Sequence, residues 1–164
     1  MERSKEIIAK SDLRRLLRLA TEDMNEFFER NPSYSRPYKG KHLLIALCQG
    51  AALHYIDRKN GVKDFDVWLF YPERKIRLPY RRRGEMDFGV SKFGKHPNDQ
   101  KYIGRRVDIL MRSNSFFNIR DPELAITNYL TKKKTKTAKL LSQKAVVGLY
   151  PDSVFGKVLW LKNL

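Results

Sequence analysis

The sequence predicts an α/β fold, in the broad sense that includes α+β: a mixed sheet with flanking helices, an N-terminal helix and a C-terminal helical segment. Three observations support this prediction. A long amphipathic pattern comes first, apolar runs of strand length around one short helix follow, and a helix start stands near residue 121. At 164 residues the chain is long enough to bury one core. We therefore expect a single domain, with an N-terminal helix and loop at 1–40, a core at 41–118 and C-terminal helices at 119–164.

Residues 11–30 have the pattern of an amphipathic helix, because apolar side chains recur at intervals of three and four residues. The residues of this stripe are Leu13, Leu16, Leu17, Ala20, Met24, Phe27 and Phe28. Ser11 is the expected N-cap. Asn31-Pro32 predicts the end of the helix, and the segment 31–40, rich in Pro, Ser and Tyr, is expected to be a loop.

Two strands around a helix are expected next. The apolar run HLLIALC at 42–48 predicts a buried strand, and Gln49-Gly50-Ala51 predicts a tight turn into a helix. Asn60-Gly61 predicts another turn. The apolar and aromatic run at 63–71 predicts a second strand, which Pro72 closes.

The basic segment 73–104, punctuated by glycines, is expected to hold one or two short strands and mobile loops. RRVDILMR at 105–112 predicts a third clear strand, with Asp108 and Leu110 on the face opposite to Val107 and Ile109.

The remainder of the chain is predicted to be helical. Asp121-Pro122-Glu123 combines an N-cap, a proline at the first helical position and an acid in the first turn. A basic link at 132–139 should lead to a second helix at 140–149 and a last short one at 154–161.

The charge balance indicates a polyanionic partner. The chain has 34 Lys and Arg against 18 Asp and Glu, a formal net charge of +16. Nucleic acid is the leading candidate, because several Lys and Arg contacts to phosphates release bound counterions. An anionic membrane surface, and a basic protein without a specific partner, remain as alternatives.

The single cysteine, Cys48, excludes an intramolecular disulfide, and with His42, His54 and His96 scattered along the chain no zinc-ligand set is evident. Cys48 and His54 are expected to be structural core residues. No apolar run has the length of a signal peptide or of a membrane span, so we expect a cytoplasmic protein with no membrane partner.

Three aspartates form the strongest candidate for chemistry. Asp64 and Asp66 project from one face of the second predicted strand, and Asp108 has a matching position in the third. If the two strands are neighbours, the three carboxylates converge and suit a magnesium ion, whose charge would offset their repulsion. Arg106 shares a strand face with Asp108, so an ion pair between them is the alternative.

The turn Gln49-Gly50-Ala51 supplies a second candidate. A glycine between a strand and a helix lets the backbone approach a ligand closely, and amides at a helix start favour phosphate. One glycine in such a turn is also ordinary structure, and its position just before the strand with the two aspartates is what favours a functional role.

The segments QGAAL at 49–53, KDFDVWLF at 63–70 and RRVDIL at 105–110 together resemble the nucleotidyltransferase (DNA polymerase β-like) superfamily. That superfamily has a G-[GS] turn that opens a helix, a strand with the pattern hDxDh and a third carboxylate in a later strand. The turn is similar to the GGTAL-like turn of the small AbiEii-type and toxin-type nucleotidyltransferases. The resemblance covers roughly residues 43–112.

The resemblance implies a nucleotidyltransferase-like core and a reaction that uses two magnesium ions. An acceptor hydroxyl attacks the α-phosphate of a nucleoside triphosphate, and pyrophosphate leaves. Asp64 and Asp66 would hold the metals, and Asp108 would bind one metal and help to deprotonate the acceptor. Gly50, with Gln49 and the amides near Ala51, would hold the triphosphate. The turn departs from the family pattern, because neither Gln49 nor Ala51 offers a hydroxyl to a phosphate.

Two basic clusters are candidates for binding nucleic acid. Arg81, Arg82 and Arg83 fall between the two acidic strands and would neutralise the triphosphate or hold a polynucleotide. Lys132, Lys133, Lys134 and Lys136 form the densest run. Either cluster has the alternative of being a solvated surface. The loop aromatics Tyr34, Tyr38, Tyr80 and Phe93 would stack on bases or, more commonly for such residues, pack at the edge of the core.

The hypothesis from the sequence is a magnesium-dependent nucleotidyltransferase that transfers a nucleotidyl group from a nucleoside triphosphate to an acceptor hydroxyl, with RNA such as tRNA favoured as acceptor by the charge. A small-molecule or protein acceptor remains open. The alternative is a catalytically silent, nucleotidyltransferase-like protein that binds nucleic acid. A rival catalytic pattern, Asp66 followed by Glu73-Arg74-Lys75, has the D…ExK form of metal-dependent nucleases.

Overall fold

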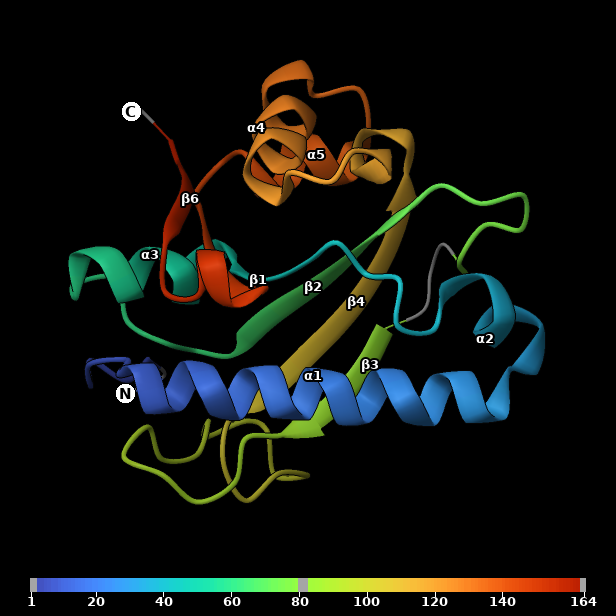
Figure 1. Cartoon of the computed structure of the whole chain (residues 1–164). Helices are drawn as coiled ribbons and strands as arrows, with labels where there is room; N and C mark the ends of the chain where they lie inside the picture. The colour runs from blue at the N-terminus through green and yellow to red at the C-terminus, as the bar shows by residue number, and fades with distance from the viewer. Residues whose placement is uncertain (1–2, 80–82, 163–164) are drawn as a thin grey trace.

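A mixed six-stranded sheet is the centre of the computed structural model, which describes residues 3–79 and 83–162 (Figure 1). The strands lie in the order β3-β4-β2-β1-β5-β6. β2 and β4 are parallel, and all the other neighbours are antiparallel. The strand bounds are β1 Leu44–Cys48, β2 Phe65–Pro72, β3 Arg83–Asp87, β4 Arg106–Asn114, β5 Ala145–Tyr150 and β6 Val158–Leu161. The predicted mixed sheet with flanking helices is confirmed.

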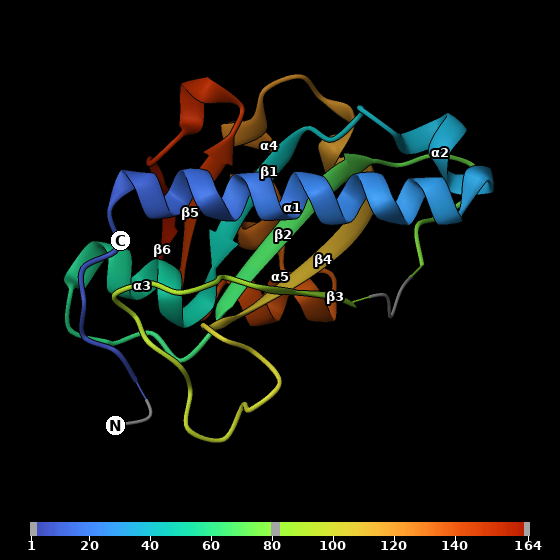
Figure 2. The same cartoon turned by 90° about the horizontal axis from the view of Figure 1, so that it is seen from below.

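Helices cover both faces of this sheet, as Figures 1 and 2 show from two directions. The long α1 crosses one face, where it packs with α3 on the larger core cluster. α4 and α5 lie on the opposite face over the smaller cluster, which includes Trp68 and Phe70. The helix bounds are α1 Lys10–Arg30, α2 Pro32–Tyr38, α3 Gln49–Asp57, α4 Pro122–Lys132 and α5 Lys136–Leu141, with 3-10 turns at Ser115–Asn118 and Asp152–Val154.

The N-terminal helix forms almost as predicted, but its start differs. Ser11 already lies inside α1, and Ala9 is the N-cap residue. The Ala9 amide donates to the carboxylate of Asp12 at 2.7 Å, which ties the residue before the helix to its first turn. The Ser11 N-cap prediction was wrong, because the helix already begins at Lys10.

The expected loop at 31–40 was also wrong, because α2 occupies most of it. Pro32 stands at the first helical turn, where its missing amide costs nothing. Tyr38 at the end of α2 is fully buried and packs edge to face on Tyr71 of β2, at 5.7 Å between ring centroids. Tertiary packing therefore stabilises a helix that the local composition did not indicate.

The predicted strands around the aspartates are confirmed. β2 and β4 alternate their side chains between the two faces, with Val67 and Ile109 in the core under α1 and Trp68 and Leu110 toward α4 and α5. Arg58 and Gly61 have positive φ in the segment that leads from α3 to β2, in agreement with the turn predicted there.

The C-terminal part of the chain departs most from the prediction. α4 begins at Pro122 with Asp121 as a side-chain N-cap, as expected. The helices expected at 140–149 and 154–161 were wrong: α5 ends at Leu141, and β5 and β6 extend the sheet beyond β1. Residues 145–161 thus belong largely to the sheet, which an apolar run rich in β-branched side chains favours when a partner strand is available.

The segment after β3 is tied to the start of β4. The Asp87 carboxylate accepts from the amides of Gly89, Ile103 and Gly104 at 2.7–3.0 Å. Of the one or two short strands expected in 73–104, the described residues form one, β3. No helix within the described residues is both long and apolar enough to cross a bilayer.

Candidate active site

Three strand ends meet at the edge of the sheet where the predicted aspartates lie. β1 ends at Cys48, while β2 and β4 both begin there, so Asp66 is in register with Cys48 on one side and with Asp108 on the other. Asp64 comes two residues before Asp66, just outside β2. The neighbouring strands on which the convergence of the aspartates depended are therefore present.

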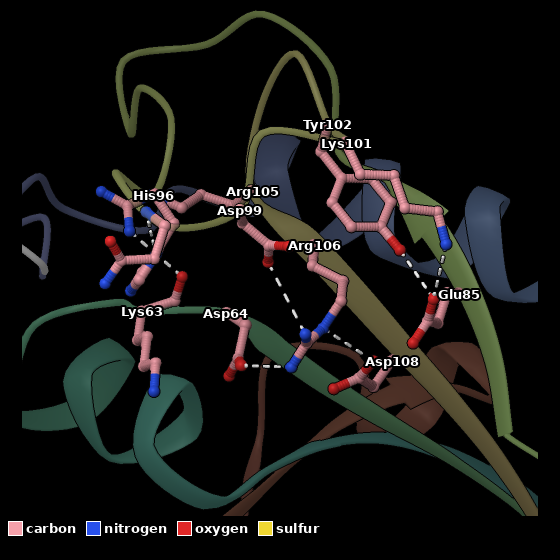
Figure 3. A network of polar contacts seen from close by, with 11 residues as sticks. Lys63, Asp64, Glu85, His96, Asp99, Lys101, Tyr102, Arg105, Arg106 and Asp108 are labelled. Carbon is pink, nitrogen blue, oxygen red and sulfur yellow. Dashed lines mark hydrogen bonds and ion pairs between the residues drawn. The ribbon is translucent and has the colours of Figure 1, made fainter.

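A guanidinium group lies among the carboxylates. Arg106 forms ion pairs with Asp64 and Asp108, each at 3.0 Å, and with Asp99 at 3.6 Å (Figure 3). Asp108 is almost fully buried, at 4% exposure. Burial lowers the pKa of Arg106, but the charges of Asp108, Asp64 and Asp99 outweigh it and hold that pKa above its usual value. The expected ion pair between Arg106 and Asp108 is confirmed, and it extends to two further acids.

The donor chemistry of this edge suits magnesium, because carboxylate oxygens are its preferred protein ligands. In the described part of the chain, however, no three His, Cys, Asp or Glu side chains stand in a ready arrangement for one ion. Asp66 and Asp108 stand at paired positions of the parallel strands β2 and β4, and Arg106 pairs with both Asp64 and Asp108. A cation held by Asp66 and Asp108 would therefore compete with Arg106 for the Asp108 carboxylate.

The glycine turn opens onto the same edge. Gln49 has a left-handed φ of 62°, unusual for a residue with a side chain, and it makes the abrupt change of direction from β1 into α3. A Cβ on Gly50 would lie 3.3 Å from Asn60 Nδ2 and 3.8 Å from both Arg3 Nη1 and Lys144 Nζ. The backbone of Gly50 therefore faces two cationic side chains.

We call the hollow at this turn the turn pocket. It has a volume of about 190 Å³ and is lined by Arg3, Gln49, Gly50, Ala51, Lys63, Asp64, Asp66 and Lys144. All three residues of the predicted phosphate-binding turn and two of the three predicted metal ligands thus line one pocket. Three cations and two carboxylates share it.

The N-terminal segment completes the turn pocket. Ser4 and Val62 exchange two backbone hydrogen bonds, of 2.9 and 2.8 Å, which place Arg3 beside the lead-in to β2. Buried His54 joins the same parts: its Nδ1 accepts from the Gly61 amide, and its Nε2 meets the Glu6 carbonyl, both at 2.8 Å. His54 is thus a structural residue, as expected.

A second hollow adjoins the turn pocket, since Lys63 and Asp64 line both. Its volume is about 240 Å³, and its other lining residues are His96, Asn98, Asp99 and Arg106. Buried Arg105 fixes its wall by donating to the carbonyl oxygens of Phe93 and Lys63, at 3.0 and 3.1 Å. Burial lowers the pKa of Arg105, which the charge of Asp64 partly offsets.

Cys48 is fully buried beneath Asp66. Burial, and next the negative charge of Asp66, raise the pKa of its thiol well above the usual value. The thiol therefore stays protonated and acts as a small apolar side chain, as expected.

The predicted nucleic-acid residues are only partly described. Arg81 and Arg82 lie outside the described residues, and for Arg83 only the backbone, opposite Leu110 at the sheet edge, is described. Lys132, Lys133, Lys134 and Lys136 are all exposed, around the end of α4 and the start of α5. Of the loop aromatics, Tyr38 and Phe93 are buried and unavailable for base stacking, Tyr34 packs partly against the core, and Tyr80 is not described.

The rival nuclease pattern does not assemble. Asp66 stands at the beginning of β2 and Glu73 just after its end, about 23 Å away at about 3.3 Å per residue. The Glu73 carboxylate instead pairs with Arg77 at 3.9 Å, and the Glu73 amide donates to Asn118 Oδ1.

Sequence reasoning missed four contributors to this edge: Arg3, Lys63, Lys144 and Asp99. Lys63 directly precedes Asp64, so its place was open to inference. The other three come from distant parts of the chain, and no local sequence pattern predicts that they lie here. They are Arg3, Asp99 and Lys144.

Searches with this chain among protein-family models, curated proteins and solved structures found no match.

Proposed function

We propose that this protein is a magnesium-dependent nucleotidyltransferase that transfers a nucleotidyl group from a nucleoside triphosphate to an acceptor hydroxyl. The observation that carries the proposal is the turn pocket. The glycine turn opens α3, while Asp64 and Asp66 stand at the start of β2, and both groups line one hollow together with three cations. A triphosphate site beside a metal site requires this juxtaposition.

The charges of the turn pocket suit a triphosphate bound through a cation. Arg3, Lys63 and Lys144 supply three positive groups, and the close approach of Gly50 leaves backbone exposed to a phosphate. The missing hydroxyl at Ala51 is compensated in this proposal by Arg3 Nη1 and Lys144 Nζ, both within 3.8 Å of the position a Gly50 side chain would take.

Asp66 and Asp108 would hold magnesium, which when bound polarises the phosphoryl oxygens and lowers the pKa of the attacking hydroxyl. The remaining roles belong to the chain's own groups. Asp108, buried in β4 between β2 and β3, would accept the proton of the acceptor hydroxyl. Arg106 keeps Asp64 and Asp108 neutralised in the ligand-free protein, and its 27% exposed side chain can reach a phosphate in the adjoining hollow.

RNA is the acceptor that the surface favours. The net charge of +16 and the exposed lysines around α4 and α5 suit a polynucleotide rather than a neutral small molecule.

The test is incorporation of label from an α-labelled nucleoside triphosphate into RNA with magnesium present. Asp66→Asn should lower the rate by more than about a hundredfold, a larger effect than outer-shell partners of a metal have, while circular dichroism shows an unchanged fold. Asp152→Asn, which removes an exposed carboxylate on the 3-10 turn at Asp152–Val154, is the matched control and should leave the rate unchanged. Equal rates for wild type and Asp66→Asn would disprove the proposal.

The ion pairs of Arg106 favour a second candidate, a nucleotidyltransferase-like protein that binds nucleic acid without catalysis. A guanidinium already satisfies Asp64 and Asp108 there, so no metal is needed to relieve their repulsion. This candidate predicts RNA binding that is indifferent to magnesium, and no incorporation of label with any triphosphate.

A further inference from the structure

A third polar hollow, which we call the basic pocket, lies between the end of β4 and the start of α5. It has a volume of about 460 Å³, and its lining residues are Arg77, Leu78, Arg112, Ser113, Asn114, Thr135, Lys136 and Thr137. Three of these are cationic, four others carry a hydroxyl or an amide, and the described lining contains no carboxylate. Such a set recognises an anion that accepts several hydrogen bonds, above all a phosphate.

Buried and bonded groups shape the walls of the basic pocket. The Arg112 guanidinium donates to Thr137 Oγ1 at 2.8 Å and lies 5.5 Å from the centre of the Trp68 ring. Thr137 is itself 8% exposed. Thr135 Oγ1 accepts from the Ala138 amide at 3.0 Å and bonds the Tyr129 hydroxyl at 2.9 Å. These contacts hold the cation and the hydroxyl groups in place before a ligand arrives.

The basic pocket and the carboxylates lie on the same face of the sheet. Asp108 and Arg112 alternate with Val107, Ile109 and Met111, which point to the other face under α1. Arg112 stands four positions after Asp108 along β4, a span of about 13 Å at about 3.3 Å per residue. About four stacked nucleotides, at about 3.4 Å each along a strand, cover this distance.

We propose that the basic pocket binds a backbone phosphate of the single-stranded RNA whose terminal hydroxyl reaches Asp108. This inference rests on the proposed function, because it names the substrate class of the same site. Lys136 lines the pocket and also belongs to the exposed lysine run, so the upstream part of the strand leaves over Lys132, Lys133 and Lys134. The phosphate anchors the strand and sets how far its end extends along β4.

The experiment measures binding of a fluorescein-labelled oligouridylate in EDTA, without magnesium or triphosphate, over a range of salt concentrations. The test variant is Arg77→Gln with Lys136→Gln, two exposed side chains whose removal leaves the half-buried Arg112 in place. The matched control is Lys10→Gln with Arg18→Gln. It makes the same change of net charge at exposed positions of α1, on the opposite face of the sheet.

The pocket variant is expected to bind about tenfold more weakly, and its plot of log affinity against log salt should be shallower by about 0.7, the change for one lost phosphate contact. The control should stay within about twofold of wild type. Equal losses in the two variants would mean that general charge, not a pocket, binds RNA, and would overturn the inference.

Two further arms separate this inference from its alternatives. Adenosine monophosphate carries the same phosphate on a free nucleotide. It should not compete at concentrations where unlabelled oligouridylate does, and equal competition would assign the pocket to a mononucleotide instead. Asp66→Asn should bind the oligonucleotide as wild type does. If that variant and wild type both bind RNA while neither transfers label, the proposed function fails and the pocket stands.

Discussion

The turn pocket and the basic pocket differ in the balance of their charges, although both open on the same sheet. The turn pocket combines three cations with the carboxylates of Asp64 and Asp66, whereas the described lining of the basic pocket is cationic without an acid. A site for chemistry on phosphates needs both signs, because a metal must be held and a triphosphate attracted. A site that only anchors an RNA strand needs positive charge alone. Under the proposed function, the turn pocket would hold the reacting groups and the basic pocket would hold the RNA strand.

Removal of Arg106 should sharpen this contrast most, since it turns the carboxylate edge from balanced to acidic. Arg106→Gln leaves Asp108 buried without its ion pair, so we expect the free energy of unfolding to fall by about 2 kcal/mol. Added magnesium should recover part of this loss, because the cation relieves the same repulsion. Chemical denaturation with and without magnesium measures both effects.

The matched variant is Arg30→Gln, which removes an exposed ion pair with Glu26 on α1 and should cost less than about 1 kcal/mol, with no response to magnesium. If magnesium raises the free energy of unfolding of Arg106→Gln by no more than it raises that of wild type, the result would argue against a cation at Asp66 and Asp108.

Gly50→Ala should weaken ligand binding in the turn pocket alone, without unfolding the protein. The added methyl group meets Asn60 Nδ2 at 3.3 Å and stands between Arg3 and Lys144, where the proposal places a phosphate. Helix propensity favours alanine, so stability should change by less than about 1 kcal/mol. We expect triphosphate affinity to fall about tenfold, about 1.4 kcal/mol, in a calorimetric titration.

Oligouridylate affinity of the same Gly50→Ala variant should match wild type, because the basic pocket is untouched. A parallel loss of both affinities would break the division of roles between the pockets.

A smaller effect is expected at the support of the basic pocket. Burial raises the pKa of Tyr129, which the bond to Thr135 and the charge of Arg112 partly oppose. A tyrosine with a raised folded pKa contributes stability that is present below its unfolded pKa, about 10, and is lost as the pH rises from there through the folded pKa. Tyr129→Phe should cost about 1 kcal/mol at pH 8 through the lost hydrogen bond. The difference from wild type should shrink by a few tenths of a kcal/mol by pH 10.5 in urea denaturation, and a constant difference would contradict the assignment.

The sequence was most informative where one strong pattern decided an element. The stripe from Leu13 to Phe28 defined α1, and the alternation around Asp66 and Asp108 defined β2 and β4, because burial on one side leaves a clear period. It failed at α2, where Tyr38 finds a tertiary partner in Tyr71, and at β5, where Val146 and Val147 suit a strand as well as a buried helix. Short apolar runs do not by themselves distinguish the two.

The candidate site shows the same limit. Asp64, Asp66, Asp108 and the glycine turn were visible because each belongs to a short motif. Arg106 was visible only as a partner of Asp108. Its ion pair with Asp64 depends on the parallel register of β2 and β4, and its ion pair with Asp99 depends on the path of the loop between β3 and β4. Arg3 and Lys144 reach the turn pocket through the pairing of Ser4 with Val62 and of β1 with β5, and no local sequence pattern predicts either pairing.

The parallel register of β2 and β4 also bears on how the protein folds. Asp64 and Arg106 are 42 positions apart, and β3 and its loop lie between them in the chain. Non-local parallel pairing closes a long loop before it gains contacts, so it is slow relative to the formation of α1 or the antiparallel pairing of β1 with β2. The carboxylate edge is therefore expected to assemble late, so that a partly folded chain with its helices in place would still lack the arrangement of Asp64, Asp66 and Asp108 on which the proposed activity depends.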